Sequence, residues 1–295
     1  MMERTRNGLI PEIGYKKLSN KIIYWSIITI LSIIAAICIL PVAWVLISSL
    51  KSLDEFYSVP PTLWPKSFHF EMIPELFSKY DFTKLYINTA FNSCGVIIFA
   101  ITVNGLMGYA LSKMKVSGGK IVFMVVLATY MLPTTVCMVP IYKNIINFPI
   151  LGVNLLNTNW PMWLMAGANA YYVIVFKSFF DGIPTSLLEA GKLDGCGDFT
   201  SFIHIVFPLS KPIISTIIIL SFSSSWGDFF WPYMVLKKAD FQTVMVRVYA
   251  MQSDTSIGIN TLLLAISFAI IPPGVVFFFC QKKIMNGFMM SGIKG

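Results

Sequence analysis

The sequence predicts an all-α membrane protein with six transmembrane helices, and three observations support this fold class. Of the 295 residues, 56% are hydrophobic and only 12% are charged, which is more apolar surface than a soluble chain of this length can bury. Six apolar runs have the length, about 20 residues, that crosses a bilayer as a helix. The basic residues lie at the ends of these runs rather than on one solvated face, which argues against a nucleic-acid-binding protein.

The predicted spans are, in chain order, Ile22–Leu46, Leu85–Leu111, Ile121–Ile141, Trp160–Phe180, Pro212–Leu236 and Ile259–Cys280. With a cytoplasmic N-terminus, the inner segments hold 14 of the 22 basic residues, as the positive-inside rule requires. We therefore predict a cytoplasmic segment at residues 1–21, a membrane domain at 22–280 and a cytoplasmic tail at 281–295. Both termini are expected on the inner side.

The connection at residues 47–84 is expected on the outer side. It contains four prolines with Trp64 and Phe68 between them, a composition typical of a structured loop rather than a flexible linker. The five cysteines lack metal-ligand spacing, and His69 and His204 are isolated. The sequence therefore predicts no metal site.

A polar break at residues 181–211 interrupts the apolar pattern on the inner side. Pro184 suits the first turn of a helix, and Gly195 with Gly197 should end that helix. A second short helix is expected from about Asp198 to Val206, giving a helix–turn–helix elbow. Two interpretations remain open: an amphipathic connector resting on the lipid headgroups, or a docking helix for a cytoplasmic partner.

The spacing of residues in this elbow resembles the EAA loop of ATP-binding-cassette importer permeases. The positions that match the pattern are Glu189, Ala190, Gly195, Ile205 and Pro208, and Asp194 with Gly195 is similar to the carbohydrate-importer permeases among them. Gly191 stands where the family usually has Ala, and Phe207 stands where it usually has Leu. The resemblance implies that the elbow, Pro184–Pro208, couples to an ATPase subunit, through these positions and Gly191.

The rest of the chain is similar to carbohydrate-importer permeases of the maltose type. The similarity includes Ser225–Pro232 and the tail Gly287–Gly295, although Phe288–Met290 departs from the small and polar residues usual there. It implies a type I importer permease fold in a bacterial plasma membrane. The implied partners are a second permease, two ATPases that bind ATP and Mg²⁺, an external solute-binding protein, a carbohydrate and membrane lipid. No cofactor or catalytic residue is expected in this chain.

Polar and aromatic residues within the spans are candidates for a substrate path, because polar groups are costly in lipid unless they are used. The candidates are Trp226, Asp228, Phe230, Trp231, Asn169 and Tyr171. Sugars bind to aromatic faces and to carboxylates or amides, which suits this set. The alternatives are an interfacial aromatic belt at Trp231 and a structural cap at Asp228. For Asn88, Asn92 and Asn104 we predict hydrogen bonds between helices.

Other functions fit less well. An ion channel should carry rings of charged or carbonyl ligands, yet Asp228 is the only acidic residue expected deep in a span. A membrane enzyme should bring together a nucleophile, a metal or paired carboxylates, and the predicted spans contain no such set. Within importers, the alternative substrates are glycerol phosphate, peptides and amino acids.

Overall fold

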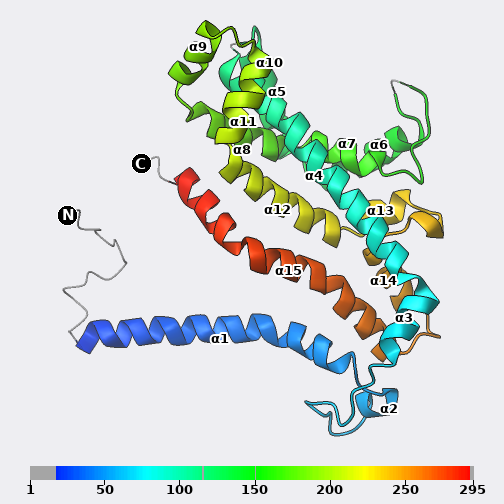
Figure 1. Ribbon diagram of the computed structural model, residues 1–295. Helices are drawn as coiled ribbons and strands as arrows, with labels where there is room; N and C mark the ends of the chain where they lie inside the picture. The colour runs from blue at the N-terminus through cyan, green and yellow to red at the C-terminus, as the bar shows by residue number, and fades with distance from the viewer. Residues whose placement is uncertain (1–17, 115, 150, 293–295) are drawn as a thin grey trace. The chain divides into compact units, whose positions relative to one another are not determined.

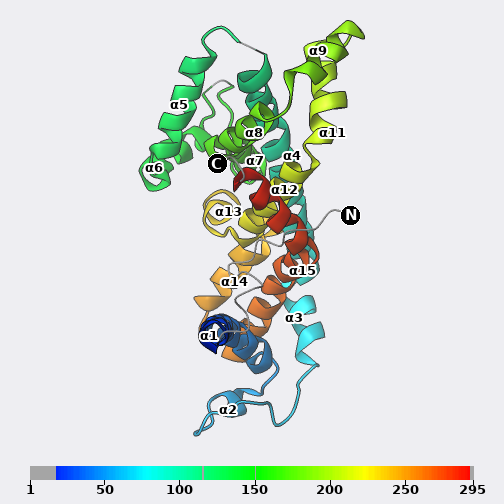
Figure 2. The same ribbon diagram turned by 90° about the vertical axis from the view of Figure 1, so that its left-hand side faces the viewer.

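A computed structural model describes residues 18–114, 116–149 and 151–292 (Figures 1 and 2). These residues form helices and loops, with no strand among them. The helices are α1 (Leu18–Ser48), α2 (Leu53–Phe56), α3 (Met72–Tyr80), α4 (Phe82–Lys113), α5 (Gly119–Met131), α6 (Thr134–Ile146), α7 (Trp160–Gly167), α8 (Ala170–Asp181), α9 (Thr185–Leu193), α10 (Asp198–Ser201), the π-helical η2 (Phe202–Val206), α11 (Phe207–Leu209), α12 (Lys211–Gly227), α13 (Phe230–Val235), the 3₁₀ turn η3 (Ala239–Phe241), α14 (Val244–Gln252) and α15 (Ile259–Gly292).

The chain forms two compact units. The first contains the residues up to Met72 together with Gly258–Ser267, and the second contains Ile73–Ile257 together with the chain from Phe268 onward. The first unit consists of α1, the loop with α2 and the beginning of α15. Its α1 is apolar on all sides, with no buried face, as expected of a helix whose surroundings are lipid or another apolar surface.

Helix α4 is the centre of the second unit. It packs against α7, α8 and α12, and α9 and α10 lie at its C-terminal end in both views (Figures 1 and 2). Small residues allow the close packing. A β-carbon at Gly108 would lie 2.7 Å from Cβ of Phe176 and 3.0 Å from the backbone nitrogen of Lys177, so only glycine admits the backbone of α8 here.

A buried cluster joins the helices of the second unit to the elbow. It includes Tyr109 of α4, Phe176 and Phe180 of α8, Leu188 of α9 and Val206 of η2. Because one cluster contains both bundle and elbow residues, the elbow is part of the packed core of this unit. It is not a separate surface strip.

Three predicted spans correspond to uninterrupted apolar helices in the structure. Helices of sufficient length and apolarity cover Asn20–Ser48, Phe82–Lys113 and Ile259–Gln281, and two bent pairs bring the number of candidate spans in the described residues to at most five. One bent pair is α5 with α6, at 105°; the other is α10–α11 with α12, at 80°.

The other three predicted spans are interrupted. Pro133 separates α5 from α6 within Ile121–Ile141, because a proline disfavours the helical conformation of the residue before it. Ala168 and Asn169 separate α7 from α8 within Trp160–Phe180. The fifth run, Pro212–Leu236, is divided at Asp228 and Phe229 into α12 and α13.

Candidate coupling surface and substrate path

The polar break at residues 181–211, which we call the elbow from here on, has the two helices that the sequence predicts. Helix α9 begins directly after Pro184, and a second helical segment runs from Asp198 to Leu209 through α10, η2 and α11. Pro208 has no N–H to donate to His204, and the wider π-helical turn of η2 precedes it.

The end of α9 is a glycine-dependent helix stop. Gly195 has φ of +82°, in the left-handed region that favours glycine. The Cys196 N–H donates to the Gly191 carbonyl at 2.9 Å, and the Gly195 N–H donates to the Lys192 carbonyl at 3.0 Å. This pair of bonds is the Schellman motif, and it fixes the angle between the two helices of the elbow.

One face of the elbow is buried and the other is exposed. Leu188, Gly191, Phe202 and Val206 face the bundle. Other apolar side chains of the elbow are exposed, with Leu193 90% accessible. The remaining exposed apolar side chains of the elbow include Leu187, Phe199, Ile203 and Phe207.

The residues matched to the EAA pattern are divided between these faces. Glu189, Ala190, Asp194 and Pro208 are exposed, Gly191 is buried and Ile205 is half-buried. Glu189 and Asp194 therefore place carboxylates beside the exposed apolar side chains. The structure brings these residues together on one short unit, which we name the coupling surface: Leu187, Glu189, Leu193, Asp194, Phe199 and Ile203.

Three side chains near the C-terminal end of α4 hold the elbow. The Tyr109 hydroxyl donates to the Asp198 carbonyl at 3.1 Å, and the Lys113 ammonium donates to the Ile183 carbonyl at 2.7 Å. The Ser112 hydroxyl donates to the Asp181 carboxylate at 2.7 Å. A displacement of the elbow would therefore be transmitted to α4. The sequence analysis missed these contacts, because the sequence does not indicate which acceptor a side-chain donor at the end of a span will bond to.

Asp181 is also the centre of the charges at this end of α8. Lys177 lies 2.8 Å from its second carboxylate oxygen. Partial burial raises the pKa of the Asp181 carboxyl, but the hydrogen bonds from Lys177 and Ser112 outweigh it and hold that pKa below its usual range. On the elbow itself, Lys192 and Asp198 form an ion pair of 3.2 Å between α9 and α10.

The predicted substrate-path residues do not form one cluster. Trp226 is 4% exposed and donates to the Ala269 carbonyl at 3.0 Å, so it is a core residue. The Asn169 side chain caps α8 by accepting from the Tyr172 N–H at 3.2 Å. Tyr171 stacks on Tyr130, with 6.1 Å between the ring centroids.

Asp228 and its aromatic neighbours form the break between α12 and α13. The Asp228 carboxylate accepts hydrogen bonds from the N–H groups of Phe230, at 2.9 Å, and Trp231, at 3.4 Å, so it caps α13. This is the structural role that the sequence left open for Asp228. Phe230 and Trp231 line an apolar pocket of about 140 Å³ together with Met138, Val139, Tyr142 and Met234.

A second aromatic group adjoins the break, and the sequence analysis missed it. Phe229 stacks on Tyr249 of α14 with 4.8 Å between ring centroids, and Tyr249 meets Tyr233 edge-on at 5.3 Å. Both tyrosines are more than 40% exposed. The density of aromatic residues in 226–233 was a usable signal, but the pairing with Tyr249 depends on how α14 folds back.

Asn92 and Asn104 of α4 hydrogen-bond to other helices, as predicted, whereas Asn88 bonds to the turn η3 and to the residue that follows it. The Asn104 amide donates to the Ala166 carbonyl at 2.8 Å and accepts from the Asn169 N–H at 3.1 Å, which fixes the break between α7 and α8. The Asn88 amide donates to the carbonyls of Asp240 and Gln242. Asn92 donates to the hydroxyl of Ser225 at 3.4 Å.

Long apolar helices packed around α4, with an elbow joined to the same core, are the architecture of a membrane-embedded helical bundle. The family model described as the binding-protein-dependent transport system inner membrane component matches residues 97–286. The chain belongs to this family of transport permeases, and it is therefore a component of an inner-membrane transport system.

Similar proteins agree with this assignment. The arabinooligosaccharides transport system permease protein AraQ of Bacillus subtilis is 29% identical over 86% of this chain and 90% of its own length. The sn-glycerol-3-phosphate transport system permease protein UgpE of Escherichia coli is 25% identical over 89% of this chain and 95% of its own.

Solved structures show the fold. A chain of a bacterial ABC transporter that imports the acidic polysaccharide alginate superposes with a TM-score of 0.80 at 22% identity, over 90% of this chain and 98% of that one. A chain of the alginate transporter in complex with an alginate pentasaccharide-bound periplasmic protein superposes with a TM-score of 0.61 at 13% identity, over 94% and 96%. The fold is that of the permease of a type I ABC importer.

Proposed function

We propose that this chain is one of two permease subunits of an ATP-driven importer for a sugar or oligosaccharide. The observation that carries the proposal is the coupling surface: exposed apolar side chains and carboxylates on an elbow that is packed into the bundle core and bonded to α4. A group of exposed apolar side chains of this kind favours contact with a partner over contact with water. The partner in this proposal is an ATPase subunit.

In this mechanism the two ATPase subunits bind ATP and Mg²⁺, and this chain contributes the lever. Leu193 and Phe199 enter a cleft on the ATPase, and Glu189 and Asp194 make polar contacts at its edge. Closure of the ATPases on ATP displaces the elbow, and Tyr109, Ser112 and Lys113 transmit that displacement to α4. ATP can drive the change only if the elbow contacts differ between the two ATPase states.

The sugar path is assigned to the aromatic groups on either side of the α12–α13 break. Phe230 and Trp231 present apolar faces in the pocket, and Tyr233 and Tyr249 add exposed rings with hydroxyl groups. Such rings bind the C–H faces of sugars while their hydroxyls bond to sugar oxygens. Asp228 serves this path by holding the break open, whereas Trp226, Asn169 and Tyr171 support the surrounding helices.

The proposal also sets orientation and partners. On this proposal the elbow and the two terminal segments, 1–21 and 281–295, face the cytoplasm; of these segments, residues 1–17 and 293–295 lie outside the described residues. An external solute-binding protein delivers the sugar to the opposite side. The names of the AraQ and alginate relatives favour a sugar as the substrate. The name of the UgpE relative makes glycerol phosphate the alternative substrate.

The test begins with the complex purified from its native host through a tag on this chain. Its partners are identified by mass spectrometry, and the complex is reconstituted with its binding protein in vesicles loaded with ATP. Uptake of oligosaccharides is then compared with uptake of sn-glycerol-3-phosphate. We expect ATP-dependent sugar uptake that Trp231→Ala lowers about 5-fold, since stacking on one aromatic ring is worth about 1 kcal/mol. Uptake of glycerol phosphate alone would contradict the sugar assignment.

A further inference from the structure

The loop between α1 and α3, residues 49–71, is held in one shape by a polar network. Lys51, only 2% exposed, donates to the Thr62 carbonyl, and its ammonium lies 4.5 Å from the centre of the Trp44 ring. The Glu55 carboxylate accepts from the Thr62 hydroxyl and from the Lys66 N–H, both at 2.8 Å. The loop is therefore cross-linked across about a dozen residues by buried charged groups, which are costly to leave unpaired.

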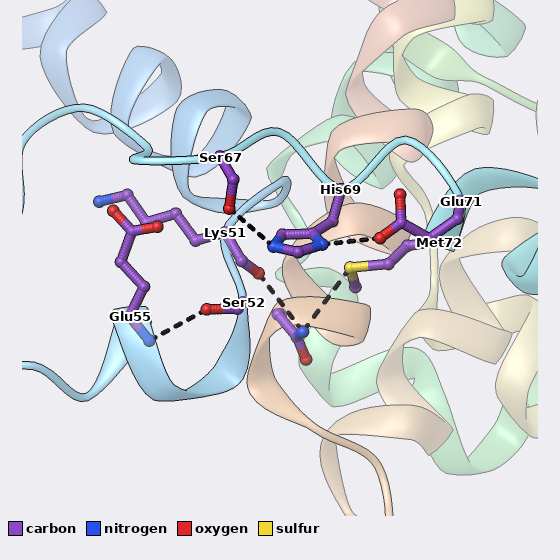
Figure 3. Close-up of polar contacts among 8 residues, drawn as sticks. Lys51, Ser52, Glu55, Ser67, His69, Glu71 and Met72 are labelled. Carbon is purple, nitrogen blue, oxygen red and sulfur yellow. Dashed lines mark hydrogen bonds and ion pairs between the residues drawn. The ribbon is translucent and has the colours of Figure 1, made fainter.

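The base of this loop lies at the C-terminal end of α1 and the N-terminal end of α15, which are both apolar helices. The His69 N–H donates to the Leu50 carbonyl at 3.1 Å, just beyond the end of α1. The amide of Asn260, at the beginning of α15, donates to the Lys51 carbonyl at 3.4 Å. Figure 3 shows this base, including the His69 ring between the Ser67 hydroxyl and the Glu71 carboxylate. Because α1 and α15 are candidate spans, the base marks the level of the membrane–water interface.

The network leaves a set of apolar side chains pointing away from the loop. Val59 is 94% exposed, Leu63 79% and Trp64 64%. Trp64 meets Phe68 edge-on at 6.1 Å, and Phe68 stacks on Phe70 at 5.8 Å. We name this set the apolar loop face: Tyr57, Val59, Leu63, Trp64, Phe68 and Phe70. A rigid loop that holds so many apolar groups in water would be unfavourable, so the face needs a non-aqueous occupant.

We propose that the apolar loop face inserts into the headgroup region of the bilayer at the C-terminal end of α1. The loop follows directly on α1, whose apolar window has no buried residue. In Figure 1 the chain that leaves α2 turns back in the direction of the N-terminal end of α1, toward the membrane that α1 would cross. Tyr and Trp, which the face contains, are the residues that prefer the interface because their rings are apolar with one polar atom.

The occupant is lipid rather than a protein because of this position. A docking surface for a soluble protein would point away from the bilayer, whereas this segment turns back along a span from a base at the interface. On the proposed orientation, the leaflet is the outer one. The loop would then fix the depth of α1 and of the beginning of α15, since both are bonded to its base.

Spin labels report the depth of the loop in the complete transport complex in lipid nanodiscs. The five native cysteines are first replaced, and one nitroxide is attached at Leu63→Cys, at Val59→Cys or at Asp54→Cys. Asp54 is an exposed polar residue of the same loop and is the matched control. Relaxation of each label by oxygen, which concentrates in lipid, is compared with relaxation by a water-soluble nickel chelate.

We expect the labels at positions 59 and 63 to be relaxed several-fold more by oxygen than by nickel, and the label at position 54 to show the reverse. Nickel relaxation at 59 and 63 equal to that at 54 would overturn the proposal. Protection from nickel that occurs only after addition of the binding protein would also overturn it, and would assign the face to protein docking. Two labelled positions keep the test valid if one variant fails to fold.

Discussion

A β-carbon on Gly191 would lie 2.6 Å from Cδ1 of Ile205, so the backbone of α9 packs directly on the side chain of η2. The Cδ1 atom of Ile205 occupies the space that a methyl group at 191 would need. Because the related pattern has Ala at 191 together with Ile at 205, this contact does not by itself account for the glycine. Gly191 and Ile205, two positions of the predicted coupling motif, are therefore one packing unit.

Replacing Gly191 with Ala should change stability by less than about 1 kcal/mol. Ala favours the helix by about 1 kcal/mol, and the clash is with the movable end of a side chain. The double variant Gly191→Ala/Ile205→Val, which removes Cδ1, should be more stable than the wild type in thermal unfolding of the purified complex. A single Gly191→Leu change should cost about 1–3 kcal/mol, as overpacking does. Equal unfolding temperatures for Gly191→Leu and wild type would contradict the packing.

Gly195 is constrained by its backbone and not by its neighbours. Its φ is +82°, while a β-carbon there would meet no atom within 4 Å. Gly195→Asn should therefore retain most coupling, because Asn tolerates the left-handed region, whereas Gly195→Val should lose about 1–2 kcal/mol and alter the elbow angle. The measurement is ATPase stimulation by the loaded binding protein. If Val and Asn perform alike, the turn does not set the geometry of coupling.

Asn104 should stabilise the bundle more than any exposed polar residue of α4. It is fully buried, and its loss would leave the Ala166 carbonyl and the Asn169 N–H without their partner. We expect Asn104→Ala to cost about 1–3 kcal/mol in reversible unfolding. The control is Thr102→Ala, because the exposed Thr102 hydroxyl bonds only to the Ile98 carbonyl of its own helix. A cost for Asn104→Ala no greater than for Thr102→Ala would rule out the bracing role.

The sequence predicted the elbow well because its determinants are local. Pro184 begins one helix and Gly195 ends it, and both effects depend on the residue itself. The three uninterrupted spans followed from apolar length alone. The three Asn residues Asn88, Asn92 and Asn104 of α4 indicated hydrogen bonds to other segments of the chain. The sequence did not indicate which segments these would be.

The remainder depended on contacts between distant segments. The break at Asn169 is stabilised by Asn104, which lies 65 positions earlier in the chain. Trp226 and Asp228 are two residues apart, yet one is buried against Ala269 and the other caps the next helix. A pattern of residue types treats both as equal candidates for substrate contact. Only the helix end at Gly227 separates their directions.

The central claim is that the coupling surface docks on an ATPase subunit. The most direct measurement places a photo-crosslinking amino acid at Leu193, the most exposed apolar residue of the elbow, in the assembled transporter. A matched probe at Leu63, which is also highly exposed but lies on the α1–α3 loop, is the control. We expect an adduct with the ATPase from position 193 alone, with a yield that changes on adding ATP. A transporter that turns over ATP but gives no ATPase adduct from position 193, or gives one equally from position 63, would contradict it.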